Sequence, residues 1–262
     1  MNKNVLAVAG FDPTGAAGIV ADLKTFQIHR LYGLGVLTAV TGQNSQGVQA
    51  VYPLPMEQVA QQLESTFSDM EIHAVKVGML ANATNVEIVA SILASYKVPL
   101  VVVDPVLKAG TGEPLLDEAG VAALKEKLLP MADLITPNLE EATLLSGVSA
   151  TDPPSMKEAA KAMMEMGPKQ VVVTGGHLEN RATDVYTDGK RFQLFDAARQ
   201  ASQNTRGIGC VFASYVTCLL VRGIAINEAV DKAKRYIAKA MVHPFKIGKA
   251  DRGPLNLTLP AV

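Results

Sequence analysis

The 262-residue sequence contains few cysteines and no tryptophan. Its two cysteines, Cys210 and Cys218, lie in a segment with helical spacing, which separates them by roughly 12 Å along a helix axis. A disulfide requires Cα atoms within about 7 Å of each other, so an internal bridge is excluded. We therefore expect two free thiols and a reducing, cytoplasmic setting.

The sequence also lacks an excess of charge of either sign, with 24 basic and 25 acidic residues. This balance argues against a surface built for nucleic acid or for membrane headgroups, although a local basic cluster around a phosphate is compatible with it. No apolar run approaches the roughly 20 residues of a membrane span, and the run near the N-terminus is too short for a signal peptide. We expect neither a nucleic-acid partner nor a membrane partner.

Short apolar runs alternate with segments of helical spacing along the whole chain. The runs lack polar alternation, which is typical of strands covered on both faces. They lie at 5–9, 35–40, 74–77, 100–103, 133–135 and 170–174. Helical spacing covers about 17–30, 56–68, 84–96, 117–129, 138–146, 155–166, 209–222 and 226–241.

This alternation predicts an α/β fold, a three-layer α/β/α sandwich with a mainly parallel central sheet, in one domain over residues 1–262. Two β-like runs flank Asp188-Gly189, which predicts a small antiparallel hairpin. Glycine or polar residues follow nearly every predicted strand, as in "GFDPTGAAG", "TGQNSQG", "DPVLKAGTG" and "TPNLEE". Because ligands bind beyond the carboxyl ends of parallel strands, these exits together predict one composite site.

The stretch "GIGC", from Gly207 to Cys210, begins a predicted helix. Glycines let backbone N–H groups converge, and a helix N-terminus adds unpaired donors and a positive dipole end, so Gly207 and Gly209 predict an anion hole. The same field favours a thiolate at Cys210, which would accept a proton from an attacking hydroxyl. The alternative is a glycine turn with a buried structural cysteine. Cys218, deeper in the helix, is predicted to be core.

Matching stretches in the same order along the chain include "FDPTGAAGIVADLKTF", "YGLGVLTAVTGQNSQGVQ", "KVGMLAN", "VVDPV", "LITPNLEEA" and "GIGCVFAS". With these stretches the chain resembles the ribokinase-like superfamily and, within it, the hydroxymethylpyrimidine and phosphomethylpyrimidine kinases of thiamine biosynthesis. The resemblance implies an ATP- and Mg²⁺-dependent kinase that phosphorylates 4-amino-5-hydroxymethyl-2-methylpyrimidine and then its monophosphate. It also implies a homodimer.

The resemblance assigns roles residue by residue. It gives Cys210, Gly207 and Gly209 the catalytic positions. Substrate binding falls to Asp12, Ala17, Gly18, Gln43, Met79 and Val106. Nucleotide and phosphate binding falls to Asn138, Thr174 and Gly176, and metal binding to Asp104 and Glu141. The spacing of Asn138 and Glu141 also fits a helix capping box, and the two interpretations are compatible.

The chain departs from the family pattern where charge is expected. Relatives often carry lysine where this chain has Thr174 and near the position of Gly110, and histidine where it has Arg206. A lysine beside ATP stabilises the transferring phosphoryl group, so its loss removes a useful charge. We expect Arg206 and Lys108 to bind phosphate and restore part of that charge.

Two alternatives stay open at this point. A pyridoxal or pyridoxine kinase shares the fold, and its substrate is also a flat heterocycle with a hydroxymethyl group. Gln43 favours the aminopyrimidine, because an amide offers both a donor and an acceptor to a ring nitrogen beside an exocyclic amine. The departures in the glycine loops are also compatible with a catalytically weakened paralogue that only binds vitamin precursors.

Overall fold

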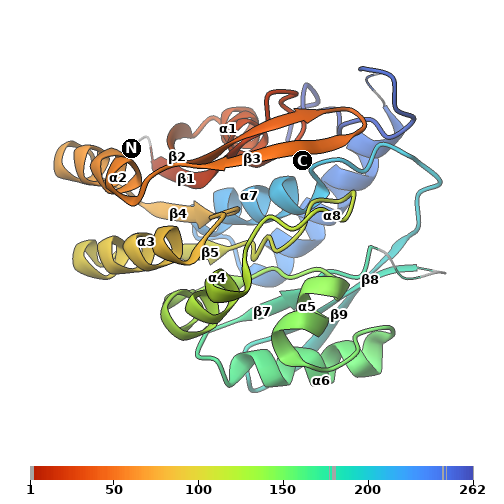
Figure 1. Cartoon of the computed structure of the whole chain (residues 1–262). Helices are drawn as coiled ribbons and strands as arrows, with labels where there is room; N and C mark the ends of the chain where they lie inside the picture. The colour runs from red at the N-terminus through yellow and green to blue at the C-terminus, as the bar shows by residue number, and fades with distance from the viewer. Residues whose placement is uncertain (1–2, 177, 179–180, 244, 246, 262) are drawn as a thin grey trace.

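The computed structural model describes residues 3–176, 178, 181–243, 245 and 247–261. The strands of this part of the chain form one nine-stranded sheet in the order β3-β2-β1-β4-β5-β6-β7-β8-β9. Helices cover both faces of the sheet (Figure 1). The three layers confirm the predicted α/β/α sandwich.

Parallel pairing runs through the centre of the sheet, and antiparallel pairing is found at both edges. β1 pairs in parallel with β2 and β4, and the parallel pairs continue from β4 through β5 and β6 to β7. β3, β8 and β9 pair antiparallel to their neighbours. The bounds are β1 (Asn4–Phe11), β2 (Tyr32–Asn44), β3 (Gly47–Pro53), β4 (Ala74–Val77), β5 (Val101–Val103), β6 (Leu134–Ile135), β7 (Val171–Val173), β8 (Arg181–Thr187) and β9 (Phe192–Ala198).

Two hairpins make the edges. The predicted hairpin at Asp188-Gly189 is confirmed as β8–β9, and it completes the main sheet at one end. The hairpin β2–β3 was not predicted, and the interpretation of "TGQNSQG" as a loop after the strand is wrong, because β2 continues to Asn44 and turns into β3 at Gly47. The side chains from Gln43 to Gln46 are half-buried or exposed, outside the helix-covered centre, and the buried Thr41 hydroxyl donates to the Phe11 carbonyl at 2.9 Å, so this stretch is tolerated in a hairpin.

The helices lie close to the segments with helical spacing. Their bounds are α1 (Gly18–Ile28), α2 (Met56–Asp69), α3 (Ala83–Tyr96), α4 (Glu118–Ala123), α5 (Leu139–Ser146), α6 (Pro153–Met164), α7 (Ile208–Leu220) and α8 (Ile226–Val242). The continuous helix expected over 117–129 is wrong in detail. α4 is followed by a π-helical turn, η1 (Leu124–Leu128), and a 3₁₀ turn, η2 (Leu129–Met131). Pro130 lies in η2 and has no N–H to donate, so the α-helical ladder cannot continue through it.

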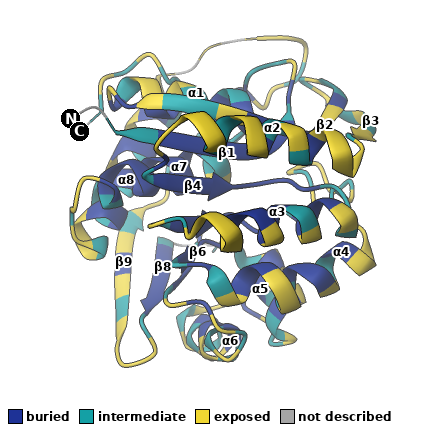
Figure 2. Cartoon of the chain, turned by 90° about the vertical axis from the view of Figure 1, so that its left-hand side faces the viewer, coloured by how far each residue is buried: buried dark blue, intermediate teal, exposed yellow. Residues whose placement is uncertain are grey.

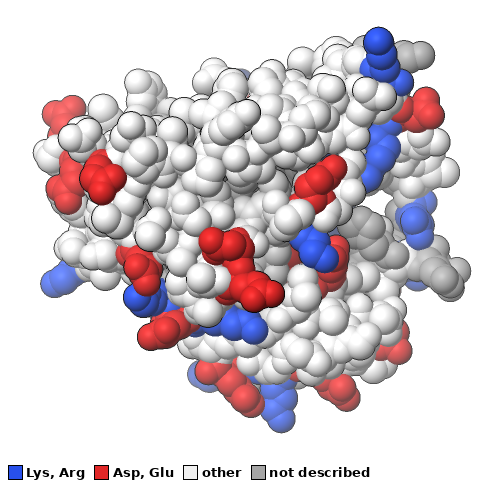
Figure 3. All heavy atoms as spheres, in the orientation of Figure 1, with Lys and Arg blue, Asp and Glu red and all other residues white. Residues whose placement is uncertain are grey.

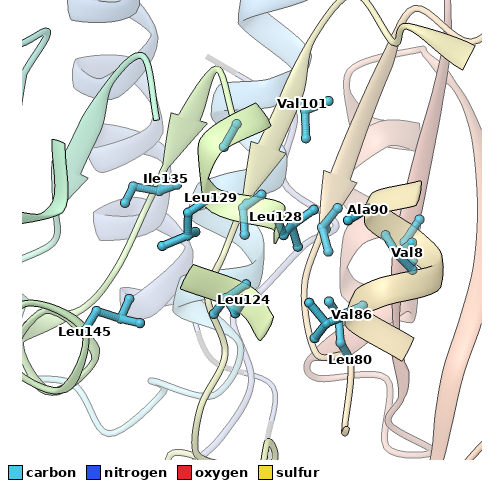
Figure 4. Close-up of a cluster of buried hydrophobic side chains, with 14 of the residues drawn as sticks. Val8, Leu80, Val86, Ala90, Val101, Leu124, Leu128, Leu129, Ile135 and Leu145 are labelled. Carbon is cyan, nitrogen blue, oxygen red and sulfur yellow. The ribbon is translucent and has the colours of Figure 1, made fainter. Parts of the chain in front are cut away.

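The core divides into two layers because successive strand residues point to opposite faces of the sheet. Leu6 and Val8 of β1 face one way and pack with α2 to α6. Figure 4 shows part of this layer, in which the helical residues Val86, Leu124 and Leu145 belong to the same cluster as Val8 and Ile135 of the strands. Val5 and Ala7 face α1, and the adjoining strands face α7 and α8. Figure 2 shows central strands such as β1 and β4 buried between helices whose outer faces are exposed, whereas the edge strand β9 is largely exposed.

The surface charges and the helices bear on the nucleic-acid and membrane partners that the composition argues against. Acidic and basic side chains are interspersed on the face shown in Figure 3, in keeping with the net charge of −1. Within the described ranges, no helix is both long enough and apolar enough to span a membrane.

Candidate active site

The loop between β1 and α1 is organised around Asp12, which is buried. One oxygen of its carboxylate accepts hydrogen bonds from the backbone N and Oγ1 of Thr14, both at 2.8 Å, and the other accepts one from the N of Ala17 at 3.0 Å. Gly18 follows at φ +57°, and a Cβ there would lie 2.3 Å from the backbone oxygen of Gly10. Only glycine therefore fits at the point where α1 begins against the end of β1.

The turn before α7 packs directly on this loop. Gly207 has φ +80°, and a Cβ on it would lie 1.9 Å from the backbone oxygen of Ala16. α7 begins at Ile208, so its first N–H groups lack helical acceptors and carry the positive end of the helix dipole. A Cβ on Gly209 would lie 3.7 Å from both carboxylate oxygens of Asp104. The predicted anion hole is therefore placed beside the end of β5.

A buried ionic cluster lies under the same turn. Lys76 of β4 is fully buried, and its Nζ lies 2.9 Å from Asp22 Oδ1 and 3.7 Å from Asp104 Oδ2. The Ser214 hydroxyl donates to Asp22 at 2.7 Å. Although burial disfavours the charged ammonium, the nearby Asp22, Cys210 and Asp104 raise the pKa of Lys76 above its usual range. The ammonium of Lys76, on β4, is therefore stabilised by one carboxylate from α1 and one that follows β5.

Cys210 lies in the first turn of α7 and is half-buried. Burial raises the pKa of its thiol to about 12, against the opposing effect of Lys76. A backbone hydrogen bond with Gly18 supports the thiolate, and a side-chain hydrogen bond joins Cys210 to Asp104. Desolvation and two carboxylates therefore oppose the thiolate that the sequence predicts at Cys210, and Lys76 favours it. Cys218 is fully buried, which confirms it as core, and both cysteines are free.

Asp104 and Glu141 form a pair of buried carboxyl groups. Burial, and then the charge of Asp22, raise the pKa of Asp104 to about 6, although Lys76 opposes this shift. Burial, and then Asp104, raise the pKa of Glu141 well above its usual value. Asp104 Oδ2 is buried without a hydrogen-bond partner in the described part of the chain. A divalent cation would relieve both the repulsion and the orphaned oxygen, so these residues fit Mg²⁺.

The capping-box interpretation of Asn138 and Glu141 is confirmed. The Glu141 N donates to Asn138 Oδ1 at 3.0 Å, and the Asn138 N donates to Glu141 Oε2 at 2.9 Å. Among the described residues, no group of three or more His, Cys, Asp or Glu side chains is arranged as a metal cage. Since Mg²⁺ keeps several waters and uses one or two carboxylates beside substrate phosphates, a dedicated cage is not required.

The apolar residues assigned to the substrate lie at the ends of β4 and β5. Met79 is buried against β1, where a Cβ on Gly10 would lie 2.8 Å from its Sδ. Val106 is half-buried two residues after Asp104. Gln43, near the end of β2, is half-buried, and its Oε1 accepts a hydrogen bond from the Thr41 hydroxyl at 3.1 Å. These three side chains follow or end neighbouring strands, on the same side as Asp12.

The residues assigned to the nucleotide lie across the sheet, after β6 and β7. Asn138 and Thr174 form a parallel bridge, and the Thr174 N donates to the Pro137 carbonyl at 2.8 Å. Gly176 is exposed, and no atom lies within 4 Å of a Cβ placed on it. Lys108 is paired with Glu140 at the start of α5.

Arg206 contacts a different part of the site from the one that Lys108 contacts. Its Nη2 is 3.7 Å from Asp12 Oδ2 and 3.4 Å from Thr14 Oγ1. The two cations expected to restore the missing lysine charge are therefore attached to different parts of the site, Lys108 beside α5 and Arg206 beside the loop after β1.

Asp22 and Lys76 are the residues that sequence reasoning missed. Each carried a signal, because a lysine interrupts the apolar run "AVKV" and an aspartate falls among the apolar residues of "GIVAD". A charged residue in a run that is covered on both faces must find a partner when the chain folds. The sequence offers no way to pair these two residues, which lie 54 positions apart.

A helix N-terminus with a cysteine in its first turn, beside buried carboxylates at the carboxyl edge of a mainly parallel sheet, defines a kinase of the ribokinase-like class. The chain belongs to the phosphomethylpyrimidine kinase family, which matches residues 12–256. It is 42% identical over 260 residues to the hydroxymethylpyrimidine/phosphomethylpyrimidine kinase of Haemophilus influenzae, covering 97% of this chain and 96% of that relative.

Solved structures agree with this assignment. The phosphomethylpyrimidine kinase of Clostridium difficile superposes with a TM-score of 0.81 at 35% identity, covering 91% of this chain and 99% of that one. The pyridoxal kinase of Staphylococcus aureus in complex with AMP-PCP and pyridoxal superposes with a TM-score of 0.89 at 32% identity, covering 98% of this chain and 94% of that one. The fold is thus shared by kinases acting on two different heterocycles.

Proposed function

We propose that this protein transfers the γ-phosphoryl group of ATP to the hydroxymethyl group of 4-amino-5-hydroxymethyl-2-methylpyrimidine, and then a second phosphoryl group to the resulting monoester. The observation that carries the proposal is the N-terminus of α7, with Cys210 in its first turn, beside the Lys76–Asp104 pair at the carboxyl edge of the sheet. The names of the relatives supply the substrate, and the ATP analogue bound to the pyridoxal kinase supports the phosphoryl donor.

The acceptor lies beside the ends of β1, β2 and β4 in this proposal. Asp12 holds the loop containing Ala17 and Gly18 over the pocket, and Met79 and Val106 form its apolar walls. The Gln43 amide reads the ring edge, since the aminopyrimidine offers an acceptor next to a donor. Flat apolar walls with a few polar groups are typical of small-molecule sites.

The nucleotide phosphates lie across the site, toward Asn138, Thr174 and Gly176. Asp104 and Glu141 would hold Mg²⁺, and the capping hydrogen bond from the Asn138 N to Oε2 fixes the Glu141 carboxylate in place. When bound, the ion neutralises charge on the phosphoryl oxygens. The N–H groups from Gly207 to Gly209 then donate hydrogen bonds to the transferring phosphoryl group and stabilise its negative charge.

Cys210 orients the acceptor hydroxyl in this proposal. With its pKa raised to about 12, the resting side chain is a neutral thiol. Phosphoryl transfer passes through a loose transition state in most analyses, so positioning and charge neutralisation contribute more than base strength. A neutral thiol that hydrogen bonds with Asp104 is suited to that role.

A coupled ADP-release assay with ATP and Mg²⁺ tests the proposal. Turnover of the aminopyrimidine alcohol and its monoester, with much lower kcat/KM for pyridoxal, is the expected outcome. Preference for pyridoxal would replace the proposal with the second candidate, which the TM-score of 0.89 to a pyridoxal kinase favours. Thermal stabilisation by the pyrimidine without any turnover would identify a binding paralogue.

The setting and assembly are part of the same proposal. Both thiols are free, in keeping with a reducing cytoplasm. The edge strand β3 exposes 63% of Tyr52, and β2 beside it exposes 37% of Val40, so this edge is the surface on which we place the homodimer contact. Light scattering of wild type and Tyr52→Glu tests the dimer, because a charge at the contact would shift the protein to monomer.

A further inference from the structure

Arg206 is a buried cation whose hydrogen bonding is incomplete. Its side chain is only 12% exposed. Nη1 is buried without a partner among the residues that the structure describes. In the same described part of the chain, Nη2 donates one long hydrogen bond, at 3.4 Å to the Thr14 hydroxyl. An anion that accepts hydrogen bonds from a buried guanidinium with unpaired N–H groups stabilises it.

Asp12 does not fill that role. It lies 3.7 Å from Arg206 Nη2, beyond hydrogen-bond distance. Both of its oxygens already accept shorter hydrogen bonds, at 2.8 Å from Thr14 and 3.0 Å from Ala17. The carboxylate partly balances the charge of Arg206 and keeps it near the loop, but it leaves the planar donor fork able to bind a second anion.

The backbone fixes Arg206 on the acceptor side of the site. Its N donates to the Gly253 carbonyl at 3.2 Å, and it forms an isolated bridge with Pro254. The next residue, Gly207, packs on Ala16. The guanidinium thus lies where the loop after β1 meets the N-terminus of α7. Asn138 and Thr174 follow β6 and β7, from which β4 and β5 separate β1 in the sheet.

We infer that Arg206 binds the phosphate of a phosphomonoester acceptor, and that it thereby makes this site competent for the second phosphorylation. The inference rests on the proposed function and assigns to Arg206 a role in the second phosphorylation that the first does not need. In the second step a monoester oxygen forms a bond to the γ-phosphorus, the bond from that phosphorus to the β–γ bridging oxygen breaks, and ADP leaves with the electron pair. Two phosphate groups must approach each other, which the neutral alcohol of the first step does not require. A fixed guanidinium offsets that repulsion.

Acceptor specificity of variants tests the inference. In Arg206→Gln, kcat/KM for the monoester should fall by about 30-fold more than kcat/KM for the alcohol, the factor expected for one lost charge-assisted hydrogen bond. Arg206→Lys should recover part of the difference, because it restores the charge without the fork. Lys127→Ala is the matched control, since this surface cation pairs with Glu87 outside the site and should leave the ratio of kcat/KM for the two acceptors unchanged. Equal losses for both acceptors in Arg206→Gln, or a rise in the KM for ATP alone, would overturn the inference.

Calorimetry without nucleotide keeps the inference separate from the proposed function. Wild type should bind the monoester about tenfold or more tightly than Arg206→Gln does, and the two should bind the alcohol alike within about threefold. If wild type phosphorylates neither acceptor, the proposed function fails while this comparison still decides the role of Arg206. Monoester binding of equal strength in both proteins, or absent from folded wild type, contradicts it. Far-UV circular dichroism establishes that the variants are folded.

Discussion

The Nζ of Lys76 lies 2.9 Å from Asp22 Oδ1, and both side chains are completely buried. The pair joins β4 to α1 at the base of the active site, with Asp104 of the next strand 3.7 Å from the same ammonium. A lone buried charge is very unfavourable, so each member makes the others tolerable. The ammonium of Lys76 in this cluster also lowers the pKa values of Cys210 and Asp104, against the effect of their burial.

Lys76→Met tests this dependence. The substitution leaves two carboxyl groups buried without their cation, so the free energy of unfolding should fall by about 3–5 kcal/mol. Urea unfolding at neutral pH measures the loss. Lys127→Met is the control, because Lys127 pairs with Glu87 at the solvent-exposed surface and should leave the free energy of unfolding almost unchanged. A Lys76→Met protein as stable as this control would contradict the account.

Gly207→Ala separates backbone strain from steric exclusion. Gly207 and Gly223 both have φ +80°, but a Cβ meets the Ala16 oxygen at 1.9 Å in the first case and no atom within 4 Å in the second. Gly223→Ala should destabilise by about 1 kcal/mol, the strain of a left-handed alanine. Gly207→Ala should destabilise more and lower kcat by about 10²-fold, because the turn must move away from the loop after β1. If Gly207→Ala and Gly223→Ala have equal effects on thermal unfolding and on kcat, the close contact between Gly207 and Ala16 does not determine the position of the turn.

Cys210 variants distinguish an orienting thiol from a base. Cys210→Ala should lower kcat by about 10²-fold, whereas Cys210→Ser should stay within about tenfold of wild type, because a hydroxyl replaces the hydrogen bond. Steady-state kinetics with the aminopyrimidine alcohol measures both. Cys218→Ala, in the core of the same helix, should leave kcat within about threefold of wild type. A serine variant as inactive as the alanine variant would instead favour proton abstraction by the sulfur.

We expect the buried His29 to lower the free energy of unfolding in mild acid. Burial, and then the charge of Arg222, lower the pKa of its imidazole from 6.5 to about 4. Between these values the unfolded chain binds more protons than the folded one, so this contribution is complete above pH 6.5 and is lost as the pH falls toward 4. Relative to His29→Phe, wild type should lose about 2 kcal/mol between about pH 7.5 and about pH 5.

Urea unfolding at the two pH values measures that difference. The comparison with His29→Phe is needed because Asp104, whose pKa is raised to about 6, shifts stability in the opposite direction over the same range. His29 packs edge-on against Tyr215 with ring centroids 4.1 Å apart, so phenylalanine keeps the ring contact and removes the titration. Parallel pH curves for the two proteins would show that the imidazole is not the group responsible.

The parallel centre of the fold was predictable from sequence because buried strands leave a strong local pattern. In "VVVD" and "VVVT" three buried valines form the strand, and the polar residue that follows them marks the carboxyl end of the strand. The capping box at Asn138 was equally local, since its two partners lie within one helical turn. The hairpin β2–β3 was missed because a half-exposed edge has the polar composition of a loop.

The sequence by itself determined the alternation of central parallel strands with helices, the glycines that allow close approach, and the residue types that follow those strands. Only the tertiary structure decided that Lys76 meets Asp22 and Asp104, and that burial raises the pKa of the Cys210 thiol. It also decided that Arg206 lies beside Asp12, whereas Lys108 pairs with Glu140. Periodicity and capping act over a few residues, whereas desolvation and charge pairing depend on which distant segments share one buried volume.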